Sequence, residues 1–496
     1  MATTSRPRTA PPLGRQLWRR KPIGAATAGG HAGPELARTI GVFQLTMFGV
    51  GATVGTGIFF VLQEAVPDAG PAVIIAFLIA GLGAGLSALC YAEMASAIPV
   101  SGSTYSYAYH ALGEFMAMVI AACVLLEYGV SSSAVAVGWS GYFNELTDSL
   151  FGVSLPDALS YSPIPYEDNV TGLINLPAVV LVLMCMMLLI RGASESALVN
   201  TVMVIIKLAV LMLFVIIGFT AFNGDHFEDF WGAGAAGISA AAATIFFSFI
   251  GLDAVSTAGE EVRDPQRALP RAIMGALAVV VTIYVLVAFA GVGAQPVEDF
   301  EDPDQQSAGL SVILENITGS SVPGTILAAG AVISIFSVTL VTLYGQTRIL
   351  FAMGRDGMLP DKFASVNPRT LTPQFNTVVV SIVVALIAGF VPSDYLWDTV
   401  SIGTLGAFTV VAIGVIVLRR THPELPRPFR VPGYPVTPIL TVAVCAYILS
   451  GLPLITWLIF GTWLLIVLAF YFFWSRRHAL LNDPHHATGP KLGEGE

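Results

Sequence analysis

A cluster of glycines interrupts the first long apolar stretch of the chain, residues 42–66. Its segment FGVGATVGTGIF contains Gly49, Gly51, Gly55 and Gly57. In hydrocarbon every unpaired backbone N–H or C=O group costs several kcal/mol, so a broken helix persists only where it lines a cavity and its freed groups meet a ligand. The glycines therefore predict a site in which backbone groups bind a small molecule.

A second apolar stretch contains a similar interruption, FFSFIGLDAVS at residues 246–256, in which Asp253 soon follows Gly251. Half-helix N-termini attract an anionic group, whereas unwound carbonyls attract a cation. A molecule with a carboxylate and an ammonium one carbon apart would satisfy both sets of groups. The two interruptions together predict a site for an α-amino acid.

Charged side chains inside apolar stretches indicate ion chemistry. Lys207, in NTVMVIIKLAVLMLF, lies about two turns inside its stretch, so we expect it to face the interior of a helix bundle beside a partner. The alternative is a side chain that reaches back to the membrane surface. Asp253 could take up a proton on one side of the membrane and release it on the other. Its alternative role is to cap the half-helix that follows.

Two further residues are weaker candidates. Glu127, in CVLLEYGVSSS, is the other acid within an apolar stretch, and it could orient Lys207 or shape the pocket. A structural hydrogen bond is its alternative role. Tyr284 could link Asp253 to its surroundings, although an aromatic residue in an apolar helix usually serves packing.

Composition shows which elements must hold these residues. Hydrophobic residues make up 55% of the 496 positions and charged residues 11%, which is typical of a polytopic membrane protein. Dividing the chain at prolines, glycines and charges gives about twelve all-α spans of roughly 18–25 residues. Their centres are near Val54, Leu82, Leu125, Leu183, Val210, Ile245, Val281, Val332, Val383, Phe408, Val444 and Leu464.

The interrupted spans are the first and the sixth, and this spacing suggests an internal repeat. Two five-span repeats related by an inverted pseudo-twofold axis bring such spans together at the bilayer midplane. We expect the repeats at residues 39–221 and 237–420, and spans eleven and twelve within residues 435–475. Residues 1–38 are expected to form a disordered tail, and residues 476–496 a second tail.

Basic residues predict the orientation. Apart from Lys207, every Lys and Arg falls in a segment that lies on the cytoplasmic side if the N-terminus does. We therefore expect both termini in the cytoplasm and a multi-pass protein of the plasma membrane. The acids that produce the net charge of −10 concentrate in the outer loops, so this charge implies no nucleic-acid partner.

Other classes of function lack support in the sequence. The chain has no HExxH motif, no Walker loop and no paired serine and histidine, and its seven histidines lie in tails or loops, so we expect no enzyme. The four cysteines lie within spans without metal-ligand spacing, and we expect neither a metal nor a cofactor. A channel would need a continuous polar pore rather than a site at the midplane. The charged loop at residues 260–271 indicates a solvated connection, which could move with the inner gate.

Four motifs in order resemble a known family. GVGATVGTGIF looks like the first-span signature of the amino acid-polyamine-organocation superfamily, and FIGLDAVSTAGEEVRDPQRALPRAI is similar to its cationic amino acid transporter family. GQTRILFAMGRDGMLP and RPFRVPGYP continue the pattern, which covers roughly residues 38–475. The resemblance implies a LeuT-like five-plus-five inverted repeat with two extra helices.

The resemblance also implies roles for individual residues. The substrate carboxylate would meet backbone N–H groups and a hydroxyl at Thr53, Gly55, Thr56 and Gly57. The ammonium would meet the carbonyls of Phe247, Ser248 and Ile250. In relatives that work without sodium, a lysine resembling Lys207 fills the volume of the sodium ion. The alternative is that the glycines only allow close helix packing.

These expectations combine into one hypothesis. The chain is predicted to be a secondary active amino acid transporter that works by alternating access, with symport of protons and no need for sodium. An amino acid exchanger or a facilitator without proton coupling is the alternative. The substrate side chain stays open between cationic and neutral amino acids.

Overall fold

The computed structural model describes residues 13–23, 36–153, 155–164, 171–300, 309–392, 394–450, 452 and 454–482. In these residues the regular elements are helices, apart from an isolated bridge between Ile40 and Val262. Eight helical stretches are long and apolar enough to cross a membrane, and four shorter apolar helices accompany them. The all-helical polytopic fold predicted from the sequence is confirmed.

The first five predicted spans correspond to a series of apolar helices. The first span is broken into α3 (Val42–Thr53) and α4 (Thr56–Ala69). The four that follow are α5 (Val73–Ala97), α7 (Glu114–Phe151), α9 (Leu176–Arg191) and α10 (Ala193–Thr220). A short buried helix, α6 (Ser103–Ala111), connects α5 to α7.

The remaining spans follow the same pattern. The sixth is broken into α11 (Gly234–Phe246), the 3₁₀ turn η3 (Phe247–Phe249) and α12 (Ala254–Thr257). The others are α13 (Pro265–Ala294), α17 (Ser321–Arg355), α18 (Gln374–Phe390), α19 (Asp394–Thr421), α20 (Val436–Ser450) and α21 (Leu454–Phe470). Outside the spans lie α8 (Asp157–Ser160), α14 (Val297–Phe300), α16 (Leu310–Thr318) and α22 (Arg476–His478).

Local sequence sets several helix boundaries. Pro265 at the first turn of α13 needs no hydrogen-bonded N–H there, and the Asn175 side chain accepts a hydrogen bond from Ala178 N at the start of α9.

The outer helix α21 is apolar all round, and it exposes Leu454, Leu458 and Leu465. Such a surface suits contact with lipid rather than with water.

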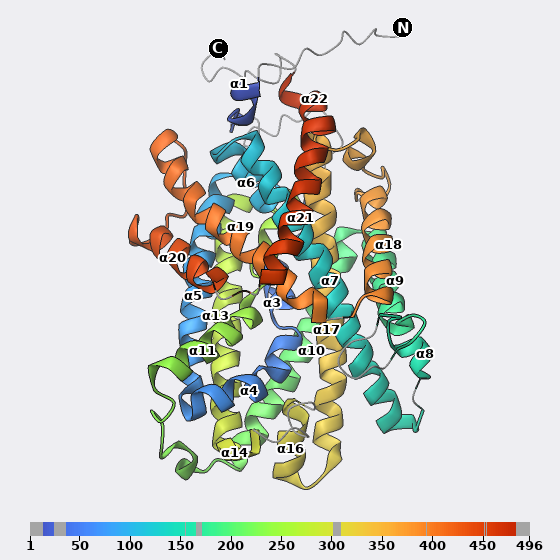
Figure 1. Cartoon of the computed structure of the whole chain (residues 1–496), viewed down its shortest axis with the longest axis vertical. Coiled ribbons are helices and arrows are strands. Elements are labelled where there is room, and N and C mark those ends of the chain that lie inside the picture. The colour runs from blue at the N-terminus through green and yellow to red at the C-terminus, as the bar shows by residue number, and fades with distance from the viewer. Residues whose placement is uncertain are drawn as a thin grey trace.

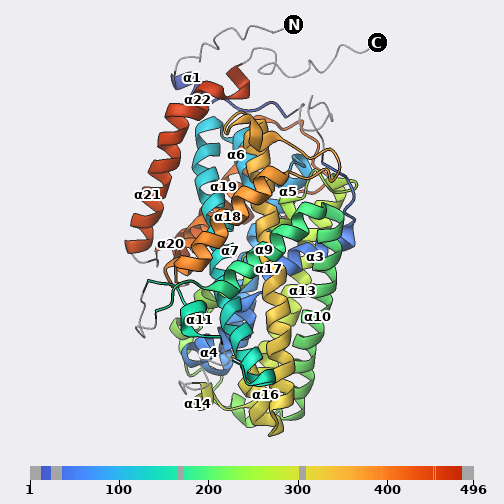
Figure 2. The ribbon, with the colours of Figure 1, turned by 90° about the vertical axis from the view of Figure 1, so that its right-hand side faces the viewer.

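The broken spans lie side by side, as the sequence predicts. α4 packs against α11, and α3 packs against α12 and α13. Figures 1 and 2 show α1 (Leu13–Leu17) and α22 at one end of the molecule, hereafter the α1 end, and α14 and α16 at the opposite, α14 end. The helices α4 and α11 lie in the half nearer the α14 end.

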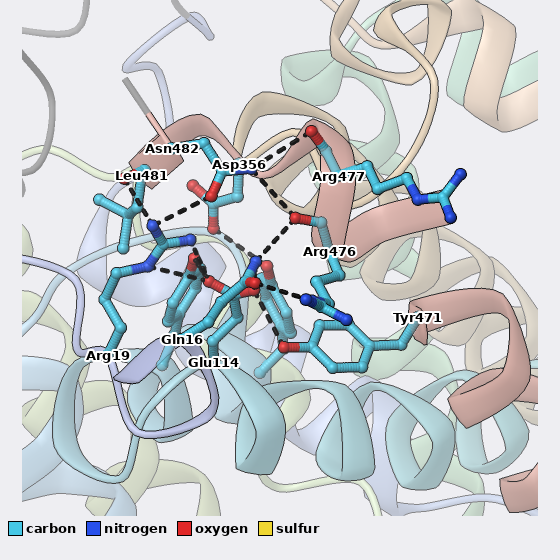
Figure 3. A network of polar contacts seen from close by, with 11 residues as sticks. Gln16, Arg19, Glu114, Asp356, Tyr471, Arg476, Arg477, Leu481 and Asn482 are labelled. Atoms are coloured by element: carbon cyan, nitrogen blue, oxygen red, sulfur yellow. Dashed lines mark hydrogen bonds and ion pairs between the residues drawn. The ribbon is translucent and has the colours of Figure 1, made fainter. Parts of the chain in front are cut away.

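Residues 13–23 correct the expectation that residues 1–38 form a disordered tail. The Arg19 guanidinium donates to both Leu481 O (2.6 Å) and Glu114 Oε2 (2.5 Å), and Gln16 donates to Glu114 Oε1 (3.1 Å) and Arg476 O (2.7 Å). Figure 3 shows this network, in which residues from both ends of the chain converge on one buried carboxylate. The composition of this segment predicted disorder because composition describes only local sequence. The residues that bind the segment are 95 or more positions away.

Candidate functional site

The break in the first span exposes carbonyl groups at the end of α3 and N–H groups at the start of α4. α3 ends at Thr53, and Val54 and Gly55 leave the helical conformation before Thr56 resumes it. The residue at the N-cap of α4 is Gly55, which has no side chain with which to cap the helix. The first turn of a helix carries unpaired donors and the positive end of the dipole, so this end of α4 can accept an anionic group.

Lys207 fills the space beside the end of α3. Its side chain is fully buried, and Nζ donates to Val54 O (2.6 Å), Gly51 O (2.9 Å) and Ser337 Oγ (2.8 Å). A cation at a helix C-terminus meets the negative end of the dipole and the free carbonyls. The ammonium therefore occupies a set of oxygen ligands, and it does not reach back to the membrane surface.

This arrangement corrects the expected link between Lys207 and Glu127. The partners of the Lys207 ammonium are backbone and hydroxyl oxygens, and no ion pair among the described residues includes it. Glu127 instead lies between α7 and α19, where a Cβ at Gly403 would be 3.2 Å from its own Cβ. Its carboxyl forms a hydrogen bond with Thr404, which agrees with the alternative role in structure, and its electrostatic neighbour is Asp253.

The break in the sixth span brings its backbone against the first. Ile250 is extended, and Gly251 has a φ of +108°, which side chains rarely adopt. A Cβ at Gly251 would lie 2.7 Å from the carbonyl oxygen of Ala52. Glycine is therefore required both by the conformation and by the close approach of the two broken spans.

Asp253 begins the second half of the broken span. Its carboxylate is buried, and Oδ2 accepts a hydrogen bond from Tyr128 Oη at 2.5 Å. Its Oδ1 and Glu127 Oε2 have no hydrogen-bond partner within the described part of the chain. Asp253 is also the N-cap residue of α12, and its carboxylate interacts with the backbone N–H of Ala254, so the alternative role as a cap stays open beside the role in proton transfer. Tyr128 was not predicted as a site residue. Its position next to Glu127 was the one feature of the sequence that could have indicated it.

Tyr284 joins the two breaks rather than Asp253 to its surroundings, which corrects the expected contact. Its hydroxyl lies 3.1 Å from Thr53 O and 2.9 Å from Ser248 O. The ring packs edge-on against Phe77 and at a tilt against Phe249, so α13 holds the hydroxyl between α3 and η3. This tyrosine fixes the relative position of the two interrupted segments.

A cavity of about 700 Å³ lies on the α4 side of the breaks. Its walls come mainly from α4, α7 and α11, and the lining residues are Thr56, Gly57, Phe60, Val61, Glu64, Gly138, Gly141, Tyr142, Ala243, Thr244, Phe247, Ser248 and Ser401. The buried Ser248 Oγ has no hydrogen-bond partner among the described residues. The cavity floor thus offers helix N–H groups and a hydroxyl to a ligand.

The structure brings part of the predicted binding set to this cavity. Thr56, Gly57, Phe247 and Ser248 line it. The Thr53 hydroxyl donates to Gly49 O at 2.9 Å, and a Cβ at Gly55 would point at Val338, 2.9 Å from Cγ2. Thr53, Gly55 and Ile250 stand outside the lining. Their predicted contacts would need a different conformation of the break.

Toward the α1 end, ion pairs join α17 to the loop after α12. Arg348 Nε donates to Glu261 Oε1 at 2.8 Å with both side chains fully buried, and Arg355 binds Glu260 at 2.5 Å. The Arg348 guanidinium also lies 3.7 Å above the Tyr344 ring centre. These four ion-paired residues, hereafter the ion-pair gate, hold Glu260 and Glu261 against α17, so the start of the loop at 260–271 is not a solvated connection. That the loop moves with an inner gate stays a prediction.

Comparison with known proteins identifies the family. The amino acid permease family matches residues 40–482. The chain belongs to this family. Amino acid permeases are membrane transporters, and the match confirms both the predicted superfamily and the prediction that the chain is not an enzyme.

Individual relatives of this permease cover nearly its whole length. The methylthioribose transporter of Bacillus subtilis is 42% identical, and the branched-chain amino acid permease BcaP of the same organism is 41% identical; each alignment covers 94% of this chain and 99% of the relative. The vacuolar cationic amino acid transporter 2 of Arabidopsis thaliana is 37% identical over 83% of this chain and 64% of the relative.

Proposed function

We propose that this permease is a secondary active transporter that couples amino acid uptake to protons, without sodium, by alternating access. It lies in the plasma membrane with the α1 end and both termini in the cytoplasm, because the basic residues gather there. The structure then corresponds to a form closed at the cytoplasmic side by the ion-pair gate, with its cavity in the outer half.

One observation carries the proposal: the Lys207 ammonium bound by the carbonyls of the broken first span. Unwound carbonyls and half-helix C-termini hold the coupling ion in transporters with broken helices. Here a side-chain cation already uses Gly51 O and Val54 O. Such a transporter needs no sodium at this place, and its driving ion must enter elsewhere.

Asp253 supports protons as that driving ion. Its carboxylate lies in the break of the sixth span beside Glu127, with Tyr128 as its hydrogen-bond donor. The state of such an acid depends on burial and on its neighbours, and both change when a cavity opens on the other side. Asp253 can therefore take a proton from the outer side and release it to the inner side.

Uptake into proteoliposomes with separately set sodium and pH gradients tests the function. We expect uptake of amino acids that is indifferent to sodium and increases when the outside is acidified. Asp253→Asn should lose accumulation driven by the pH gradient and retain binding through the backbone groups. Lys207→Met keeps the length of the side chain but removes the cation, so that only the hydroxyls of Ser337 and Ser334 still donate to Gly51 O and Val54 O. We expect it to fail to transport, because nothing then balances the negative end of the α3 dipole.

The control is Glu298→Gln, which removes an exposed acid of α14 outside the spans and should behave as the parent does. Strict dependence on sodium would contradict the role of Lys207. Full accumulation of amino acids by Asp253→Asn under a pH gradient would contradict the role of Asp253 in proton coupling. An exchanger or a facilitator would then be the remaining interpretation. Because one relative carries methylthioribose, the panel includes this compound, and exclusive uptake of it would exclude amino acids as substrates.

A further inference from the structure

One charged side chain lines the cavity on the α4 side of the breaks. Among the described residues that line it, Glu64 alone is ionisable as an acid or base at neutral pH, and most of its neighbours in the wall are apolar or aromatic. Glu64 is exposed, although most of α4 around it is buried. No ion pair among the described residues neutralises it. The cavity therefore contains a carboxylate without a cationic partner.

Helix geometry places Glu64 above the break. Gly57, Phe60, Val61 and Glu64 are spaced at i, i+3, i+4 and i+7, so they share one face of α4, and all four line the cavity. Gly57 and Glu64 are separated by about 10 Å along the helix axis at 1.5 Å per residue. Helical side chains lean toward the N-terminus, so the Glu64 carboxylate leans back toward Gly57.

A long cationic amino acid can bridge this separation. With ordinary bond lengths, an extended arginine places its guanidinium carbon about 7–8 Å from its carboxylate carbon. With a hydrogen bond of about 2.9 Å at each end it spans about 13–14 Å, which exceeds the rise of about 10 Å, so the bound substrate lies at a slant to the α4 axis or bends its side chain. The walls formed by Phe60, Tyr142 and Phe247 can cover the methylene groups between the two charged ends. A leucine side chain would end far short of Glu64.

We propose that Glu64 is the residue that selects substrates with a cationic side chain. This inference rests on the proposed amino acid site at the break. The substrate carboxylate binds the N-terminus of α4, and the guanidinium or ammonium at the other end of the substrate pairs with Glu64. The surrounding apolar wall strengthens the attraction between these charges relative to water.

Arginine and citrulline form the decisive pair of ligands, because citrulline has nearly the same shape and a neutral end. Competition against a transported amino acid in proteoliposomes measures both affinities. We expect the parent to bind arginine at least tenfold more tightly than citrulline and Glu64→Gln to bind the two about equally. Glu64→Asp should keep part of the preference. Asp68→Asn, which removes an exposed acid one turn farther along α4 and outside the lining, should keep all of it.

Two results would overturn the inference. The first is a parent that does not distinguish arginine from citrulline, or that transports leucine but neither of these ligands; amino acid transport itself would then stand. The second is Glu64→Gln with an undiminished preference for arginine. A parent that transports no amino acid at all would instead contradict the proposed function, so the two failures are separable.

Discussion

At the scale of single residues, the geometry of the site depends on which hydrogen-bond partners each side chain can reach. Lys207 uses oxygens of the first break, and Tyr284 holds the two breaks together. Asp253 keeps one carboxylate oxygen without a partner in the described residues. The cation, the anchor and the proposed proton carrier are separate residues, so each can be tested alone.

Gly57 provides the test of the cavity floor. A Cβ at this position would lie 2.6 Å from Ser248 Oγ and 3.1 Å from Ser248 Cα, so Gly57→Val cannot be accommodated without moving the break. We expect the variant to fold but to lose at least a hundredfold in substrate affinity, measured by substrate-induced thermal stabilisation.

The matched control is Gly461→Val, because a Cβ at Gly461 would meet nothing within 4 Å. It should bind as the parent does. Gly55→Val is a less suitable variant, since its side chain would press on Val338 and disturb packing with α17 as well. Unchanged stabilisation in Gly57→Val would remove the binding site from the start of α4.

At the scale of elements, α17 acts as the fixed wall on which the broken spans rest. Its Ser337 contacts both Lys207 and the end of α3, and its Arg348 and Arg355 bind the loop that follows α12. An opening at the α1 end must separate these pairs. The buried pair is the stronger restraint, because removing one member leaves an uncompensated charge.

Glu261→Gln should therefore favour the form that is open at the α1 end. Loss of one partner from a buried pair costs about 3–5 kcal/mol, which corresponds to a shift of a hundredfold or more in population. Hydrogen exchange of residues 254–263 should accelerate accordingly. Glu260→Gln is the comparison, since its pair with Arg355 is 18% exposed on each side and should matter far less. Equal exchange in the two variants would exclude Glu261 as the main restraint.

At the scale of the whole molecule, contacts close the α1 end, whereas the cavity lies toward the α14 end. The cavity lies in the half near the α14 end, whereas the α1 end has the ion-pair gate and, beyond it, the contacts of Gln16 and Arg19 with Glu114 and the C-terminal residues. Segments from both ends of the chain thus meet over one face. This asymmetry is what a single state of an alternating-access cycle requires.

Arg19→Gln tests the contribution of these terminal contacts. The substitution removes the charged hydrogen bond between Arg19 and the fully buried Glu114, which is worth about 1.5–3 kcal/mol. Hydrogen exchange of residues 471–482 should therefore accelerate by tenfold or more. Arg20→Gln is the matched control, because Arg20 is the exposed neighbour with the same charge. The same acceleration in both variants would attribute the effect to net charge rather than to the contact with Glu114.

Hydropathy and helix-breaking residues were enough to predict the class of protein, the approximate spans, the two breaks and the burial of Lys207. These follow from local properties, since hydropathy and helix breaking are carried by neighbouring residues. The resemblance to the family named the cavity-lining positions Thr56, Gly57, Phe247 and Ser248, and it also named Thr53, Gly55 and Ile250, which lie outside the lining.

The contacts between individual atoms could not be predicted in this way. Lys207 binds carbonyls rather than Glu127, Tyr128 rather than Tyr284 binds Asp253, and Arg348 pairs with a glutamate 87 positions away. Each of these contacts depends on which faces of distant helices come together and on a side-chain reach of a few ångströms. Residue type and spacing cannot supply that information, because the facing of two helices is set by the packing of the whole bundle.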